Sequence, residues 1–145
     1  KRPALFETSL EKIQVGRFSQ LSTALPTFTL YEVLQMIEKT HYSAIPIVDV
    51  DGLLIDTLYK ADLARVTPAD LLAFANTPIA QVLRSWREKG VLRTYASNTC
   101  TMDAAMEVVL TTLMDSRLRS LVVVDASRHI RGIVALTDIL RCFLV

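Results

Sequence analysis

The chain contains an internal duplication. A run of apolar residues that ends in an acid occurs twice, at residues 45–49 and 121–125, and thirteen residues further on each copy has a second acid, Asp62 in the first and Asp138 in the second. Two copies that each lack a complete core must pack on one another, and the cleft between them is a natural ligand site. We therefore expect a two-repeat protein with a binding cleft.

Each copy is predicted to run helix, strand, strand, helix. In the first copy the apolar residues of 30–37 recur with the period of a helix, which residues 29–32 open with a capping-box pattern. The matching stripe of the second copy covers 102–113. Alignment of Leu30 with Met102 then requires about four extra residues, close to one turn, later in the second helix.

A strand pair follows each helix. The predicted strand, turn and strand are 45–49, 50–52 and 53–58 in the first copy and 121–125, 126–128 and 130–136 in the second. After each pair, an acid is expected to open a short apolar helix.

A helical connector is predicted between the copies. Residues 67–70 and 77–80 each place Thr at a likely N-cap position and Pro at the first helical position. The predicted organisation is a first repeat with an N-terminal lead-in over residues 1–66, a connector over 67–90 and a second repeat over 91–145. The fold class expected is α/β, of the α+β kind, in one cooperative domain.

Composition excludes several classes of function. A chain of 145 residues can bury a sizeable core, and its 51% of hydrophobic residues fits strands covered on both faces. The net charge is only +1, without a basic stripe, which argues against a nucleic-acid partner. No apolar run reaches the roughly 18 residues of a membrane span. Because the chain begins at Lys1, we expect a piece of a longer protein.

Catalysis is not expected. The two histidines, His41 and His129, do not form a nucleophile and base set, and the chain has neither a phosphate-binding loop nor a dinucleotide fingerprint. Cys100 and Cys142 are expected to be free, buried and reduced, as in an intracellular protein. Recognition by a preformed cleft is the better class of hypothesis.

The acids Asp62 and Asp138 have two interpretations. A carboxylate at a strand end can accept hydrogen bonds from the vicinal hydroxyls of a ribose. Alternatively, an Asp at the start of a helix is an N-cap that satisfies free backbone N–H groups. Their equivalent places in the two copies weaken the N-cap interpretation, although duplication also copies structural residues.

The repeated pattern resembles the CBS domain, and the pair looks like a Bateman module. Residues 9–16, 41–49, 88–92 and 132–140 are similar to the C-terminal CBS pair of the gamma subunit of AMP-activated (Snf1-type) protein kinase. The resemblance implies repeats related by a pseudo-twofold axis, with AMP, ADP or ATP as ligands in the clefts and no resident cofactor.

The resemblance also implies partners and a location. These are a kinase catalytic subunit, a scaffolding subunit and a second CBS pair of the same subunit. An isolated pair is expected to associate with itself as a homodimer. A cytoplasmic location that can extend to the nucleus follows, and the function implied is energy sensing as a regulatory subunit.

The resemblance implies a set of nucleotide-binding positions, with Asp62 and Asp138 as ribose acids and Arg84 as a phosphate ligand. The matching residues are Asp138, Thr137, Asp62, Lys60, Ser43, Ala44, Arg84 and Leu92. Other positions depart from the family: Arg17 replaces a Thr, Ser22 an Ala, Tyr59 and Ala135 a small hydroxyl residue, and Arg119–Ser120 a His-Arg pair.

These departures lead to one hypothesis and its alternative. Arg119 can still supply positive charge to a phosphate, whereas the phenol of Tyr59 can fill the volume meant for a nucleotide. We expect one surviving site that uses Asp138, and an impaired site at Asp62. The alternative is a structural module that assembles kinase subunits with empty sites; a third reading is a CBS module of another regulated enzyme or transporter.

Trp86 also has two interpretations. It lies in the basic stretch 84–87, and Trp and Arg are common in interface hot spots. Core packing is the other role open to it.

Overall fold

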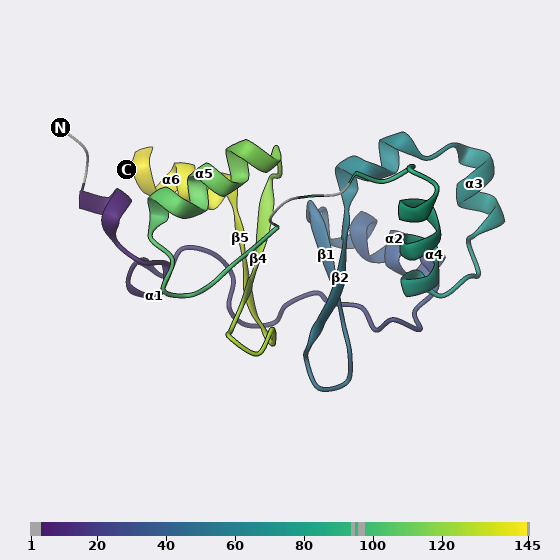
Figure 1. Cartoon of the computed structure of the whole chain (residues 1–145), viewed down its shortest axis with the longest axis horizontal. Coiled ribbons are helices and arrows are strands. Elements are labelled where there is room, and N and C mark those ends of the chain that lie inside the picture. The colour runs from purple at the N-terminus through teal and green to yellow at the C-terminus, as the bar shows by residue number, and fades with distance from the viewer. Residues whose placement is uncertain (1–3, 94, 96–97, 145) are drawn as a thin grey trace. The chain divides into compact units, whose positions relative to one another are not determined.

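Mixed helices and strands form two units in the computed structural model, which describes residues 4–93, 95 and 98–144 (Figure 1). The first-repeat unit is Ser22–Thr94, and the second-repeat unit joins Lys1–Leu21 to Tyr95–Val145. In chain order the elements are η1 (Ala4–Glu7), α1 (Leu10–Ile13), α2 (Leu30–Thr40), β1 (Ala44–Val48), β2 (Leu54–Tyr59), η2 (Lys60–Arg65), α3 (Pro68–Ala73), α4 (Ile79–Glu88), β3 (Thr99–Cys100), α5 (Met106–Ser116), β4 (Ser120–Val124), β5 (Ile130–Ala135) and α6 (Leu136–Leu144). The α+β class predicted from the sequence is confirmed.

Helix α2 and strand β1 form the centre of the first-repeat unit. Thr29 and Glu32 close a complete capping box at the start of α2, as predicted. Strand β1 is buried along its whole length and pairs antiparallel with β2. The face that carries Ile45 and Leu58 packs with α2 and α4 in one core, which includes Trp86. Core packing therefore accounts for Trp86.

The second-repeat unit repeats this plan. Strand β4 is buried throughout and pairs antiparallel with β5, while α5 and α6 pack on β4 and β5 (Figure 1). Nothing in the sequence pattern predicts the short strand β3, which pairs parallel with β4 and makes the sheet order β3-β4-β5.

The N-terminal lead-in, the part of the chain before Ser22, belongs to the second-repeat unit. The N–H of Leu10 donates to the carbonyl of Ala104 at 3.0 Å, and Arg17 exchanges backbone hydrogen bonds with Ile133 of β5 at 2.8 and 2.9 Å. Helices α3 and α4 of the connector instead belong to the first-repeat unit. The compact units thus divide the chain differently from the sequence repeats, whose limits remain a prediction.

The duplication extends to individual hydrogen bonds. The Oδ1 atom of Asp49 accepts from two backbone N–H groups of the β1–β2 turn, at 2.9 and 3.0 Å. In the β4–β5 turn, Oδ1 of Asp125 accepts from Ser127 and His129, each at 2.9 Å. These backbone bonds, that from His129 foremost, lower the pKa of Asp125. Each strand pair also has a register shift before the last residue of its first strand.

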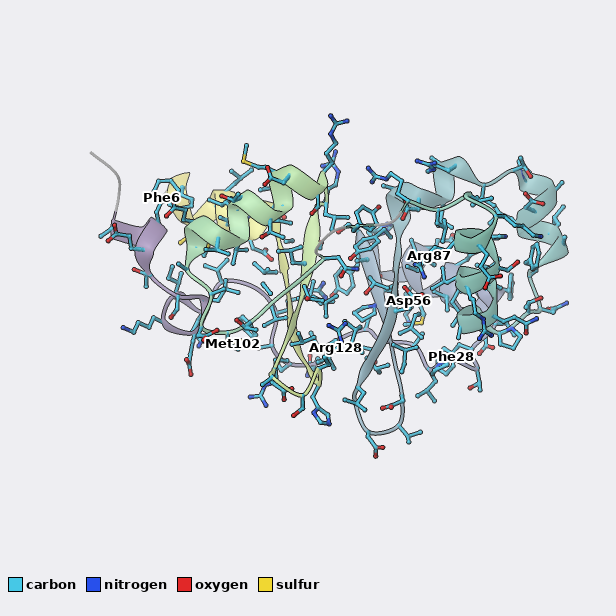
Figure 2. The ribbon with its side chains drawn as sticks, viewed as in Figure 1. Phe6, Phe28, Asp56, Arg87, Met102 and Arg128 are labelled. Atoms are coloured by element: carbon cyan, nitrogen blue, oxygen red, sulfur yellow. The ribbon has the colours of Figure 1, made fainter. Side chains whose placement is uncertain are left out.

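The start of one helix corrects the sequence analysis. Helix α5 begins at Met106, so Met102 lies outside it (Figure 2). The extended residue Ala105 precedes the helix, and the backbone of Ala104 is already paired with the lead-in. Met106 therefore corresponds to Leu30, and the extra residues of the second copy precede the helix instead of lengthening it.

The connector helices begin in two different ways. The side chain of Thr67 accepts from the N–H of Asp70 at 3.1 Å and caps α3, as predicted. Helix α4 has Pro78 as its N-cap, so Thr77 lies one residue too early to cap it. A backbone bond from Ile79 to the carbonyl of Phe28, at 2.6 Å, fixes this start instead.

The two turns differ at one equivalent position, and this difference generates a stability prediction. Gly52 has φ of 86° in the first turn, and Arg128, which Figure 2 labels, occupies the equivalent place in the second turn with φ of 66°. Only glycine adopts this region without steric cost. We expect Arg128→Gly to raise the free energy of unfolding by about 0.5 kcal/mol. The matched change Gly52→Arg should lower it by about 1 kcal/mol. Urea unfolding followed by circular dichroism measures both, and equal effects of the same sign would contradict the assignment.

Candidate functional site

The two predicted ribose acids lie at equivalent places. Asp62 is the third residue after the end of β2, in the 3₁₀ helix η2, and Asp138 is the third residue after the end of β5, in α6. Neither occupies the N-cap position, which Tyr59 holds before η2. Both carboxylates therefore lie in the first turn of a helix, where the helix dipole favours negative charge.

Asp138 remains accessible. Its side chain is 29% exposed, and its Oδ2 accepts a long hydrogen bond of 3.4 Å from the N–H of Ala135. Its Oδ1 lies 3.8 Å from Nη1 of Arg141, one turn further along α6 and 79% exposed. An exposed pair of this kind contributes little. The carboxylate can thus accept further hydrogen bonds from outside the chain.

Asp62 is in a different state. Its side chain is only 5% exposed, and its Oδ1 lies 3.5 Å from Nε of Arg93, which follows α4 in the same unit. Tyr59, at the end of β2, is also buried. The first-repeat carboxylate is therefore enclosed and paired with a cation of the chain itself.

Backbone pairing brings the other predicted residues to these acids. The N–H of Lys60 donates to the carbonyl of Ser43 at 2.9 Å, next to the pair of Ala44 with Tyr59. In the second-repeat unit the N–H of Leu136 donates to the carbonyl of Arg119 at 2.8 Å. Ser43, Ala44 and Lys60 thus lie at the strand ends before Asp62.

Near Asp138, Arg119 directly precedes β4, and Thr137 lies in the first turn of α6. Both side chains are exposed. A cation and a hydroxyl close to an accessible carboxylate are groups that suit a phosphate and a sugar.

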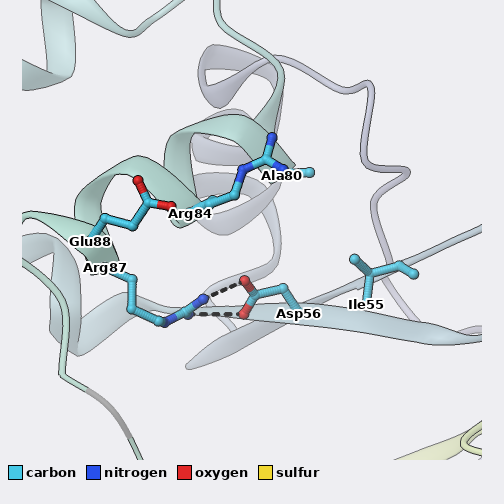
Figure 3. Close-up of a pocket in the computed structure, with 6 residues that line it drawn as sticks. All are labelled: Ile55, Asp56, Ala80, Arg84, Arg87 and Glu88. Carbon is cyan, nitrogen blue, oxygen red and sulfur yellow. Dashed lines mark hydrogen bonds and ion pairs between the residues drawn. The ribbon is translucent and has the colours of Figure 1, made fainter.

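The remaining predicted site residues lie elsewhere. Leu92 is buried in the core of the first-repeat unit. Arg84 is an exposed residue of α4 that lines a pocket of about 480 Å³ between α4 and β2 (Figure 3). The pocket is lined by Ile55, Asp56, Ala80, Arg84, Arg87 and Glu88. Within residues 4–93, 95 and 98–144, no hydrogen bond or ion pair joins Arg84 or Leu92 to either acid.

Two of the residues that line this pocket form a bidentate ion pair. Nη1 and Nη2 of Arg87 donate to the carboxylate of Asp56 at 2.7 and 3.0 Å (Figure 3). The hydrogen bond to Asp56 is the main reason that the pKa of Arg87 is raised, against the opposing effect of burial. The positive charge of Arg87 is thus already balanced by Asp56, and the phosphate role of Arg84 in this pocket stays a prediction.

Sequence reasoning missed both long-range ion pairs. Asp56 could have been found, because it pairs with the core residue Ile47 and so lies at an inward position of β2. An inward acid predicts a cation on the covering helix. Arg93 offers no comparable signal, since it follows α4 in an irregular segment without periodicity.

Both cysteines are free and half-buried, so the expectation of free thiols is confirmed and that of full burial is not. Burial raises the pKa of the Cys100 thiol to about 12, and the thiol is neutral at pH 7. Over residues 4–93, 95 and 98–144, no group of three or more His, Cys, Asp or Glu side chains could hold a metal ion. The same residues include no helix with the length and apolar character that a membrane crossing requires.

A protein-family comparison matches the chain twice. The model of the CBS domain matches residues 18–69 and 92–145. Among curated proteins, the AMP-activated protein kinase subunit gamma of Dictyostelium discoideum is 28% identical over 143 residues, 97% of this chain. The gamma-3 subunit of Homo sapiens is 22% identical over 99% of the chain. The chain spans only 25% and 29% of the lengths of these relatives.

Solved structures show the same fold. The CBS domain pair of protein MJ0100, in complex with 5′-methylthioadenosine and S-adenosyl-L-methionine, has a TM-score of 0.67 at 24% identity, with 94% of this chain and 95% of that chain covered. CBSX2 in complex with AMP has a TM-score of 0.69 at 17% identity, with coverage of 94% and 96%. A CBS-domain protein of Agrobacterium tumefaciens, ATU1752, reaches 0.72 at 16% identity, with coverage of 99% and 98%.

The bidentate pair leads to a stability prediction. Asp56→Asn removes the charge-assisted bonds and leaves Arg87 unpaired, so we expect the free energy of unfolding to fall by about 1–3 kcal/mol. Urea unfolding followed by the fluorescence of Trp86, the single tryptophan, reports on this unit.

Glu88→Gln serves as the control, because Glu88 is an exposed residue of the same pocket. It should change stability by less than about 0.5 kcal/mol. An Asp56→Asn protein as stable as this control would show that the pair contributes nothing.

Proposed function

The chain belongs to the CBS domain family, and we propose that it is an adenine-nucleotide-sensing regulatory module of a kinase gamma subunit. The double family match and the gamma-subunit relatives supply the context. The AMP complex of CBSX2 and the adenosyl-ligand complex of MJ0100 indicate the class of ligand. A regulatory role without catalysis is part of the proposal.

One observation carries the ligand proposal. Asp138 lies three residues after the end of β5, keeps 29% of its side chain exposed and makes only weak contacts within the chain. An ionised carboxylate can accept both vicinal hydroxyls of a ribose, which neutral side chains at this position could not do as well. Thr137, in the first turn of α6, and Arg119, directly before β4, are exposed and supply a hydroxyl and a cation for the rest of a nucleotide.

Regulation would follow from thermodynamic linkage. A nucleotide that binds one arrangement of a kinase complex more tightly shifts the complex toward that arrangement by the difference in affinity. Because the chain spans about a quarter of its gamma relatives, we propose that catalytic and scaffolding subunits and a second CBS pair complete the complex. The location that we propose is the cytoplasm, with access to the nucleus.

A second function has its own support. Asp62 is paired with Arg93, and Tyr59 is buried beside the strand ends. A module with both sites closed would serve only to assemble kinase subunits. The accessibility of Asp138 favours the sensing function over this structural one.

Nucleotide titration tests the proposal directly. We expect AMP, ADP or ATP to bind the purified chain saturably in isothermal titration calorimetry, with a stoichiometry of one. Asp138→Ala should weaken binding at least tenfold, because it removes a charge-assisted acceptor worth about 1.5–3 kcal/mol.

Asp51→Ala is a matched control, because it removes an exposed carboxylate in the β1–β2 turn. It should bind like the wild type. Absence of binding at millimolar nucleotide would favour the assembly function, and equal losses in both variants would argue against a specific ribose acid. Addition of the chain to a kinase complex that lacks its gamma subunit, with and without AMP, tests the regulatory part.

A further inference from the structure

We propose that the guanidinium of Arg93 pairs with the Asp62 carboxylate in place of a ligand. Arg93 thereby prevents a ligand from binding at the first-repeat site. This inference rests on the proposed function, since it assumes that the acids after the second strands are the ligand acceptors. It goes further because it names a residue outside the family motif, Arg93, as the one that determines whether ligand binds at Asp62.

The duplication provides an internal comparison. Asp62 and Asp138 follow their strands at the same distance, yet their side chains are 5% and 29% exposed. The cation near Asp138 is Arg141, a neighbour on the same helix that is 79% exposed and 3.8 Å away. Arg93 comes from a different part of its unit, is 33% exposed and lies at 3.5 Å.

Several contacts fix the segment that immediately precedes Arg93. Immediately before it, the N–H groups of Val91 and Leu92 donate to the carbonyl of Trp86 at 2.8 and 3.4 Å. The side chain of Leu92 is buried in the core. Nε of Arg65, at the end of η2, donates to the carbonyl of Val91 at 2.9 Å. The segment before Arg93 is therefore fixed to both α4 and η2, so the pairing needs little further ordering of the chain.

The competition is between unequal donors. A ribose offers two neutral hydroxyls, whereas Arg93 offers a charged donor to a carboxylate that is almost fully enclosed. Separation of such a pair leaves charge without its partner in a poorly solvated place. A nucleotide must first displace Arg93, and its apparent affinity falls by the fraction of molecules in which the carboxylate is open.

Every protein in the experiment has the substitution Asp138→Ala, so that only the first-repeat site can bind. Each also has Tyr59→Ser, because the phenol of Tyr59 is a separate obstacle to ligand. This double variant is the background, and AMP binding to it is measured by equilibrium dialysis. We expect no saturable binding in this background and about one equivalent of bound AMP when Arg93→Met is added. Further addition of Asp62→Ala should abolish that binding. As a control, Lys89→Met removes an exposed cation at the end of α4. Added to the background in place of Arg93→Met, it should produce no AMP binding.

The outcomes separate this inference from the proposed function. Binding in the Tyr59→Ser background with Arg93 intact, or no binding in a folded Arg93→Met protein, overturns the role of Arg93. The proposed Asp138 site is tested by titration of the wild-type chain, so the Asp138 site and the role of Arg93 can each fail independently of the other. Arg93→Gln, which keeps a neutral donor for Asp62, replaces Arg93→Met if thermal melting shows that the Met variant does not fold. It should also bind AMP.

Discussion

The burial of two short strands is the constraint on which this structure depends. Every residue of β1 and of β4 is buried, so neither strand can leave backbone groups or a polar face open to water. An antiparallel neighbour satisfies one edge of each, and helices cover one face. The turn acids Asp49 and Asp125 close the hairpins with the same hydrogen bonds. Every strand-end residue of the candidate site takes its place from these two hairpins.

A duplicated scaffold lets its two copies diverge without loss of the fold. The acids Asp62 and Asp138 lie beyond the paired residues of the strands, so their surroundings can change while the strands stay paired. In one copy the carboxylate is enclosed with Arg93, and in the other it stays accessible. The last residues of the second strands follow the same difference. Tyr59, a large residue, precedes the enclosed Asp62, and Ala135, a small one, precedes the accessible Asp138.

The sequence predicts what depends on local periodicity and on repetition. The capping box at Thr29, the two strand pairs and the equivalence of the two acids are all visible in the residue pattern, and the structure confirms these elements. The site residues near the strand ends follow from the same repetition, with a family resemblance to give them roles. Those roles remain predictions until ligand binding is measured.

What the sequence does not show depends on pairing over long distances. The start of α5 at Met106 depends on a lead-in nearly a hundred residues earlier, whose backbone pairs with Ala104. The pairs of Arg87 with Asp56 and of Arg93 with Asp62 likewise join segments about 31 residues apart, beyond the reach of helix or strand periodicity. In the case of Asp62, this long-range contact determines whether an acid that fits a ligand motif is open to a ligand. A family motif identifies the acceptor, but its availability depends on charges that the motif does not include.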